Sequence, residues 1–158
     1  MVCVIQRVIH SLVEIESKVY SSIDNGLLVF LAIEKNDGIK EIEWIINKIL
    51  TLRIFSNPEG KFDLSIKDIA GEILIISQFT LAADPKKGRR PDFSNAMEIS
   101  KAKEMFETFV ENIKKKYNPL KVKTGVFQAE MKIKLVNDGP VTIILDTKHL
   151  REKNGSTT

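Results

Sequence analysis

The chain is organised around the stretch Ile73-Leu74-Ile75-Ile76-Ser77-Gln78-Phe79-Thr80, in which an uninterrupted apolar run ends in polar side chains. A run this apolar is typical of a strand that is buried on both faces. We therefore expect a central strand over residues 72–80. Its end would carry the hydroxyls of Ser77 and Thr80 and the amide of Gln78 to the edge of the core.

A second stretch of the same character is Asn137-Asp138-Gly139-Pro140-Val141-Thr142. The Gly-Pro pair predicts a polar turn, and the apolar run that follows predicts a final strand over residues 141–146. Two polar turns beside two buried strands form one site if the fold brings them together. The sequence by itself leaves that question open.

The pattern of the remaining chain predicts an α+β domain whose sheet is mainly antiparallel. Residues 11–16 and 19–23 alternate polar and apolar side chains on either side of a short turn, as in a hairpin. Further strands are expected at 2–8, 27–33, 122–126 and 130–136. Apolar side chains at helical spacing predict two principal helices, over residues 39–53 and 102–117.

The overall composition bounds the kind of protein. A length of 158 residues suits one domain, and a hydrophobic content of 43% is enough for a core. The apolar runs are too short to span a bilayer, and the opening Val2-Cys3-Val4-Ile5 reads as a strand rather than a leader. The single cysteine excludes an intrachain disulfide. We expect a cytoplasmic protein with no membrane partner.

Basic residues gather directly after the central strand. They are Lys86, Lys87, Arg89 and Arg90, and a second group comprises Lys114, Lys115, Lys116, Lys121 and Lys123. A surface charge run is ordinarily just a solvated face. A basic cluster beside a candidate site also suits phosphate groups, and the sequence leaves both interpretations open.

The polar residues of the two motifs suggest acyl-transfer chemistry without an obvious base. Neither His10 nor His149 falls in the spacing of a metal site or of a Ser–His–Asp triad, so we expect no metal and no organic cofactor. Ser77 or Thr80 is a weak nucleophile without a base. Alternatively, backbone N–H groups near Phe79 and Thr80 stabilise an oxyanion. In a third interpretation the hydroxyls only satisfy hydrogen bonds at the strand end.

The two motifs resemble the signature motifs of the D-aminoacyl-tRNA deacylases. The first is Ser77-Gln78-Phe79-Thr80-Leu81 and the second is the stretch from Asn137 to Thr142. Shorter matches are Ile5-Gln6-Arg7-Val8, Arg53-Ile54-Phe55 and Lys87-Gly88-Arg89-Arg90-Pro91-Asp92-Phe93. The resemblance covers a domain over residues 1–147, followed by a polar tail over 148–158 that we expect to be disordered.

The resemblance implies a small barrel-like fold and a homodimer whose active sites lie at the subunit interface. It implies that the Gly139-Pro140 peptide is cis and enters the partner's pocket, where its carbonyls bind the substrate's ammonium group. An L side chain would collide with this turn, whereas a D side chain would point away. Glycine has no side chain to collide, so mischarged glycyl-tRNA(Ala) would also be hydrolysed.

The resemblance also assigns roles to other residues. Arg7 would hold the Gly-Pro turn, and Phe79 and Met131 would line the pocket for the adenosine or the amino acid. Catalysis would come from the backbone of residues 77–80 and from the 2′-hydroxyl of the tRNA's terminal adenosine. The basic loop at Lys86–Arg90 would contact acceptor-stem phosphates.

Two other functions remain open from the sequence. A Ser/Thr esterase with Thr80 as its nucleophile would act on small esters that lack RNA. A non-catalytic tRNA-binding module would bind its ligand without turnover.

Overall fold

The computed structural model describes residues 1–86 and 88–152. The strands are β1 (Val2–Ile15), β2 (Lys18–Ile23), β3 (Gly26–Ala32), β4 (Phe55–Ser56), β5 (Phe62–Leu64), β6 (Glu72–Ser77), β7 (Val122–Thr124) and β8 (Lys132–Asp146). The α-helices are α1 (Ile39–Thr51), α2 (Ile99–Lys116) and α3 (Lys148–Glu152), and the 3-10 helices are η1 (Phe79–Ala82) and η2 (Pro119–Lys121). Among the described residues, no helix combines the length and apolar composition needed to cross a membrane.

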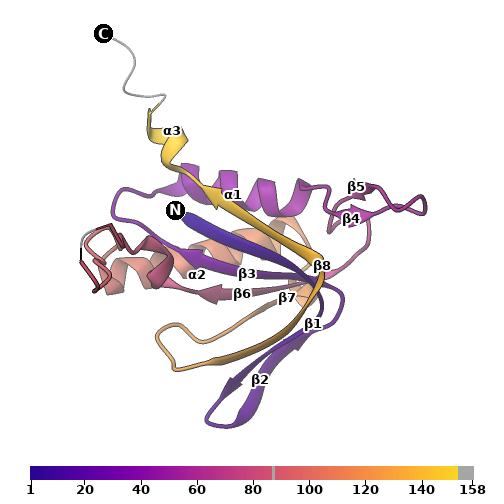
Figure 1. Cartoon of the computed structure of the whole chain (residues 1–158), viewed down its shortest axis with the longest axis horizontal. Coiled ribbons are helices and arrows are strands. Elements are labelled where there is room, and N and C mark those ends of the chain that lie inside the picture. The colour runs from indigo at the N-terminus through magenta and orange to yellow at the C-terminus, as the bar shows by residue number, and fades with distance from the viewer. Residues whose placement is uncertain (87, 153–158) are drawn as a thin grey trace.

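The long strand β1 organises the sheet. Its first half pairs with β3 and its second half pairs with β2, while β8 runs antiparallel along its other side. The sheet continues from β3 to β6 and β7 through parallel pairing. Because one strand takes different neighbours along its length, the sheet curls into a nearly closed barrel (Figure 1). The predicted α+β fold with a barrel-like, mainly antiparallel sheet is confirmed.

Two apolar cores lie on opposite faces of this sheet. Both principal helices pack on one face, where the isoleucine stripe of α1 and the phenylalanines of α2 meet alternate residues of β1, β3 and β6. The remaining alternate residues, such as Leu28 and Leu74, face the barrel interior together with Val8, Val13 and Ile23. Strands β3 and β6 are therefore buried on both faces, as their apolar runs predict.

In three places the course of the chain differs from the sequence prediction by more than a shift of a few residues at an end. Strand β1 is continuous through residues 9 and 10, because β8 pairs with it on both sides of that point. The central strand ends at Ser77, and Phe79 to Ala82 form η1. Strand β8 continues through the Gly-Pro pair, although the four residues 138–141 lie between the paired positions Asn137–Val8 and Thr142–Gln6. The expected turn is thus a protrusion from a continuous strand.

The expected disordered tail differs over its first part, since residues 148–152 form α3. The ring of His149 lies edge-on to Trp44 with centroids 4.8 Å apart, and its Nδ1 lies 2.8 Å from the Asp146 carbonyl oxygen. The Thr147 N–H also donates to the Met1 carbonyl at 3.0 Å. These contacts explain why residues 148–152 form a helix packed on the domain. Residues 153–158 lie outside the described residues, and the domain boundary at 147 stays a prediction.

Candidate active site

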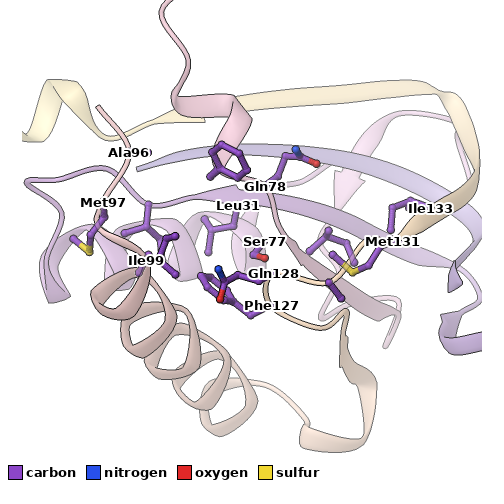
Figure 2. A pocket seen from close by; sticks show the side chains of 15 residues that line it. Leu31, Ser77, Gln78, Ala96, Met97, Ile99, Phe127, Gln128, Met131 and Ile133 are labelled. Atoms are coloured by element: carbon purple, nitrogen blue, oxygen red, sulfur yellow. The ribbon is translucent and has the colours of Figure 1, made fainter. Parts of the chain in front are cut away.

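A cavity of about 510 Å³ opens at the carboxyl end of β6. Its walls come from β3, from the segment after β6, from the start of α2 and from the loop between β7 and β8 (Figure 2). Leu31, Ile99, Phe127 and Met131 give it a mainly apolar lining. The polar lining comes from Ser77, Gln78 and Gln128. A mainly apolar cleft that has a few polar groups at fixed positions can bind a planar ring whose edge carries hydrogen-bonding groups.

The mouth of the cavity carries an exposed aromatic pair. Phe79 is 59% exposed although it lines the cavity. Its ring meets that of Phe93 edge to face, with centroids 5.0 Å apart. An aromatic side chain held in this way presents a stacking surface without burying it in the core.

Unpaired backbone donors lie beside this aromatic pair. The Gln78 N–H completes the sheet by donating to the Leu31 carbonyl at 2.8 Å. The next two N–H groups, of Phe79 and Thr80, begin η1, where a helix supplies no acceptor of its own. Among the described residues, neither of them donates a hydrogen bond. Two adjacent free donors at a helix start are suited to an oxyanion.

Among residues 1–86 and 88–152, no base contacts the Thr80 hydroxyl. The contact of Thr80 Oγ1 is the Gln78 side-chain amide, which donates to it, and Thr80 is not among the residues that line the cavity. His10 faces Asp24 at 3.6 Å and His149 lies on Trp44, so neither histidine contacts residues 77–80. The described part of the chain contains no cluster of three or more His, Cys, Asp or Glu side chains able to hold a metal ion.

Met131 reaches the cavity because a glycine makes room for it. A Cβ on Gly125 would lie 2.5 Å from Met131 Sδ and 3.1 Å from Ile76 Cδ1. The Gly125 N–H donates to the Ile75 carbonyl at 3.1 Å, which holds this backbone against β6. The methionine thus packs directly over the end of the central strand.

Gly139 and Pro140 lie outside this cavity. Both residues are exposed, the peptide between them is cis, and neither is among the residues that line the pocket. Gly139 has φ +134°, a conformation that favours glycine, and a Cβ there would lie 2.7 Å from Val141 Cγ2. One chain alone does not bring the two predicted motifs together.

Arg7 holds the base of this protrusion. The side chain is buried at 8% exposure, where its Nε donates to the Asp138 carbonyl at 3.0 Å and its Nη1 donates to the Ile54 carbonyl at 2.8 Å. The Asp138 carboxylate lies 3.2 Å from Arg7 Nε. From the other side, Asn137 accepts from the Val141 N–H at 2.8 Å. The protruding segment is therefore held by side chains rather than by the sheet ladder.

The basic loop lies between η1 and α2. Lys86, Arg89 and Arg90 are exposed, and Lys87 lies outside the described residues. The loop is closed at its base because the backbones of Asp84 and Asp92 exchange hydrogen bonds of 2.8 and 3.2 Å. Along the chain, the basic side chains of this loop therefore come directly after the segment that forms the mouth of the cavity.

The sequence analysis missed the wall formed before and within α2. Met97 donates its N–H to the Ile33 carbonyl at 3.0 Å, which fixes this segment beside β3. The Glu98 carboxylate caps α2 by accepting from the N–H groups of Ser100 and Lys101. Hydrogen bonds from the Ser100 side chain and backbone lower the pKa of Glu98. The signal available in the sequence was Ala102, which begins the apolar stripe of this helix.

Comparisons with known proteins agree over nearly the whole chain. A family model described as D-Tyr-tRNA(Tyr) deacylase matches residues 4–146. A D-aminoacyl-tRNA deacylase from Thermosipho melanesiensis is 51% identical over 148 residues, which cover 94% of this chain and 98% of the relative. One from Aquifex aeolicus is 53% identical over 150 residues, covering 95% of this chain and 100% of the relative.

Solved structures share the fold. The structure of a c-Myc DNA unwinding element binding protein matches with a TM-score of 0.89 and 41% identity, covering 92% of this chain and 98% of the other. A structure described as a probable eukaryotic D-amino acid tRNA deacylase matches with a TM-score of 0.78 and 15% identity, covering 91% and 97%. The second likeness extends the shared fold to a distant sequence.

Proposed function

The chain belongs to the D-Tyr-tRNA(Tyr) deacylase family and is a hydrolase of carboxylic ester bonds; from this we propose how it selects and cleaves D-aminoacyl-tRNA. The cavity at the end of β6 receives the terminal adenosine with its ester. The Gly139-Pro140 turn of a second subunit then completes the cavity. The amino acid is tested for chirality between the two subunits.

The separation of the two motifs within one chain is the observation that carries this proposal. The cavity has aromatic and backbone groups suited to an adenosine ester, but Gly139 and Pro140 are not part of its lining. The exposed turn is held from behind by Arg7, and its outer surface is free to enter another molecule. A homodimer would supply the missing wall to both cavities at once.

Exposed apolar side chains on the paired strands β1 and β8 support this dimer. Ile9 on β1 and Val136 and Ile144 on β8 are each more than half exposed, at 53%, 51% and 70%. Large exposed apolar side chains of this kind are available to pack against a second subunit. These strands also carry Arg7 and the protruding turn, so the same surface would deliver the turn to its partner.

In the proposed reaction, water adds to the ester carbonyl and the backbone N–H groups of Phe79 and Thr80 bind the resulting oxyanion. The bond between the acyl carbon and the ribose 3′-oxygen then breaks. The proton lost by the attacking water passes through the neighbouring 2′-hydroxyl of the tRNA to the leaving 3′-oxygen. This route needs no side-chain base and no cofactor. In it, Ser77 and Gln78 shape the segment that presents the two N–H donors to the substrate.

Selection would be steric. Carbonyl oxygens of the Gly-Pro turn bind the substrate ammonium, so the amine, the ester and the Cα hydrogen fix the direction of the side chain. An L side chain meets the turn, a D side chain points outward, and glycine meets nothing. Glycyl-tRNA(Ala) is therefore a second substrate, and the identity of the D side chain is not read.

The tRNA itself would be held mainly through its backbone. Lys86, Lys87, Arg89 and Arg90 follow the mouth of the cavity in sequence, where acceptor-stem phosphates would pass. Since aminoacyl-tRNA is made and consumed in the cytoplasm, the proposed substrate places the enzyme in that compartment. Residues 1–147 would form the catalytic domain.

Deacylation of matched D-tyrosyl-, L-tyrosyl- and glycyl-tRNA tests the proposal. We expect loss of the D and glycyl esters with the L ester spared. Equal loss of the D and L esters would contradict chiral selection by the turn. Binding without loss of any ester would point to a non-catalytic module. Sedimentation analysis of the same protein should show a dimer.

A Thr80→Val variant separates the proposed route from a threonine esterase. The substitution removes the hydroxyl and keeps the backbone N–H that the proposal uses. We expect turnover within a few-fold of the parent. A loss of about a millionfold in kcat, as when the serine nucleophile of a protease is removed, would instead favour the esterase.

A further inference from the structure

Phe62 on β5 lies next to the arginine that holds the Gly-Pro turn. The centre of the Arg7 guanidinium lies 5.3 Å from the centroid of the Phe62 ring. We propose that Phe62 is a positioning residue for chiral selection, because its ring keeps Arg7 in the orientation that holds the Gly139-Pro140 turn. The inference rests on the proposed role of that turn.

The guanidinium fills the space between the β4–β5 hairpin and the protrusion of β8. Its Nε donates to the Asp138 carbonyl and its Nη1 donates to the carbonyl of Ile54, which immediately precedes β4. On the side of the turn, a Cβ on Gly139 would lie only 3.0 Å from Nη2. A small rotation of the guanidinium would therefore press on the backbone of Gly139 or withdraw support from Asp138.

The N–H donors of a guanidinium lie in its plane, so hydrogen bonds alone leave the faces of that plane without a restraint. The Phe62 ring provides this restraint, since a cation is attracted to the electron-rich face of an aromatic ring within about 6 Å. Guanidinium groups are also weakly hydrated and stack well on such rings. The hairpin thus gives Arg7 both an acceptor, the Ile54 carbonyl, and a surface to lie on.

The Phe62 ring is not part of the packed interior of the fold. Phe62 is 56% exposed and belongs to neither apolar core of the described residues. Its backbone pairs with that of Ser56 in the hairpin, a pairing that any side chain allows. The neighbouring ion pair between Arg53 and Asp63, at 3.4 Å, tethers the hairpin independently of the ring. A large exposed aromatic with one specific contact points to a role in that contact.

The test compares Phe62→Leu, which keeps apolar bulk but loses the ring, with Phe62→Tyr, which keeps the ring. The matched control is Tyr20→Leu, another exposed aromatic residue at 55%, located on β2. For each protein, kcat/KM is measured on D- and L-tyrosyl-tRNA, and the thermal unfolding midpoint is recorded. The D/L ratio of kcat/KM is the readout that a merely structural role would not move.

We expect the D/L ratio to fall about threefold to tenfold in Phe62→Leu, the range that a lost cation–π contact supports. Phe62→Tyr and Tyr20→Leu should keep the parent ratio, and all unfolding midpoints should stay close to the parent value. An unchanged ratio in Phe62→Leu, or an equal fall in Tyr20→Leu, overturns the inference while the proposed function stands. A parent protein that hydrolyses both esters equally overturns the proposed function and this inference with it.

Discussion

The segment at Ser77–Thr80 and the protrusion at residues 138–141 are both polar interruptions of apolar strands, yet the molecule supports them in opposite ways. The first continues from β6, a strand paired on both sides and buried on both faces. The second leaves the ladder of β8 and depends on the side chains of Arg7 and Asn137. Backbone pairing secures one region, whereas side-chain hydrogen bonds secure the other.

This difference suggests that one region carries out the chemical step and the other selects the substrate. Main-chain donors that directly follow a well-paired strand are insensitive to most substitutions, which suits the chemical step that every substrate shares. A turn held by a few side chains can be altered without disturbing the core, which suits selection. The variants below are chosen to affect one region and leave the other intact.

The largest effect is expected from Gly139→Ala in the turn. A Cβ would lie 2.7 Å from Val141 Cγ2 and 3.0 Å from Arg7 Nη2, at a φ of +134°. We expect the D/L ratio of kcat/KM to fall about 10- to 100-fold, the range given by backbone strain of this kind. Deacylation assays on D- and L-tyrosyl-tRNA measure it.

Gly38→Ala is the control for this variant, because a Cβ there meets only Glu41 Oε2 at an ordinary 3.7 Å. Its D/L ratio should equal that of the parent. If Gly139→Ala folds and keeps full discrimination, the turn is not the selective element and the contrast between the two regions loses its functional meaning.

The next effect is expected from Phe79→Ala at the mouth of the cavity. Loss of a ring on which a base stacks should raise KM for D-tyrosyl-tRNA about 5- to 50-fold. Because the turn is untouched, the D/L ratio should stay at the parent value. Steady-state kinetics on both esters give the two quantities.

Leu120→Ala, at a 79% exposed position of η2, is a suitable control for a lost exposed apolar side chain. It should leave KM unchanged. A fall in the D/L ratio of Phe79→Ala would show that the cavity and the turn do not act separately.

A smaller effect is expected when Lys86, Arg89 and Arg90 are all changed to Glu. The salt dependence of kcat/KM should become shallower in log–log slope by about 0.9, the value for a duplex, for each acceptor-stem phosphate contact that is lost. Assays across a series of salt concentrations measure the slope. The D/L ratio should not change, since the loop is proposed to contact tRNA phosphates and not the amino acid.

Lys114, Lys115 and Lys116 at the end of α2 provide a control with the same change of charge when all are replaced by Glu. If this variant alters the slope as much as the loop variant does, general attraction rather than a local contact explains the salt dependence.

The smallest effect is expected from Asp138→Asn. The substitution removes the partly exposed ion pair with Arg7 and keeps the carbonyl oxygen to which Nε donates. We expect stability to fall by about 0.5 kcal/mol and the D/L ratio to stay within about twofold. Chemical denaturation and the two-ester assay provide the measurements. A tenfold fall in the ratio would mean that the carboxylate, rather than the carbonyl, holds the turn.

Local patterns determined the greater part of the fold. The isoleucine stripe predicted α1 and the alternating residues predicted the β1–β2 hairpin, because each face of these elements meets a different environment. The same reasoning misjudged residues 79–82 and 148–152. There, the end of the sheet and the contact of His149 with Trp44 set the conformation, and both depend on residues far away in the sequence.

By itself the sequence determined the fold class, the family and the two motifs, since apolar periodicity and short motifs are properties of neighbouring residues. Only the tertiary structure decided that the motifs lie apart in one chain, that Gly139-Pro140 protrudes from a continuous strand, and that Phe62 meets Arg7. These facts depend on contacts between residues widely separated along the chain. Such contacts leave no periodic trace, because they are fixed by strand register and packing rather than by local preference.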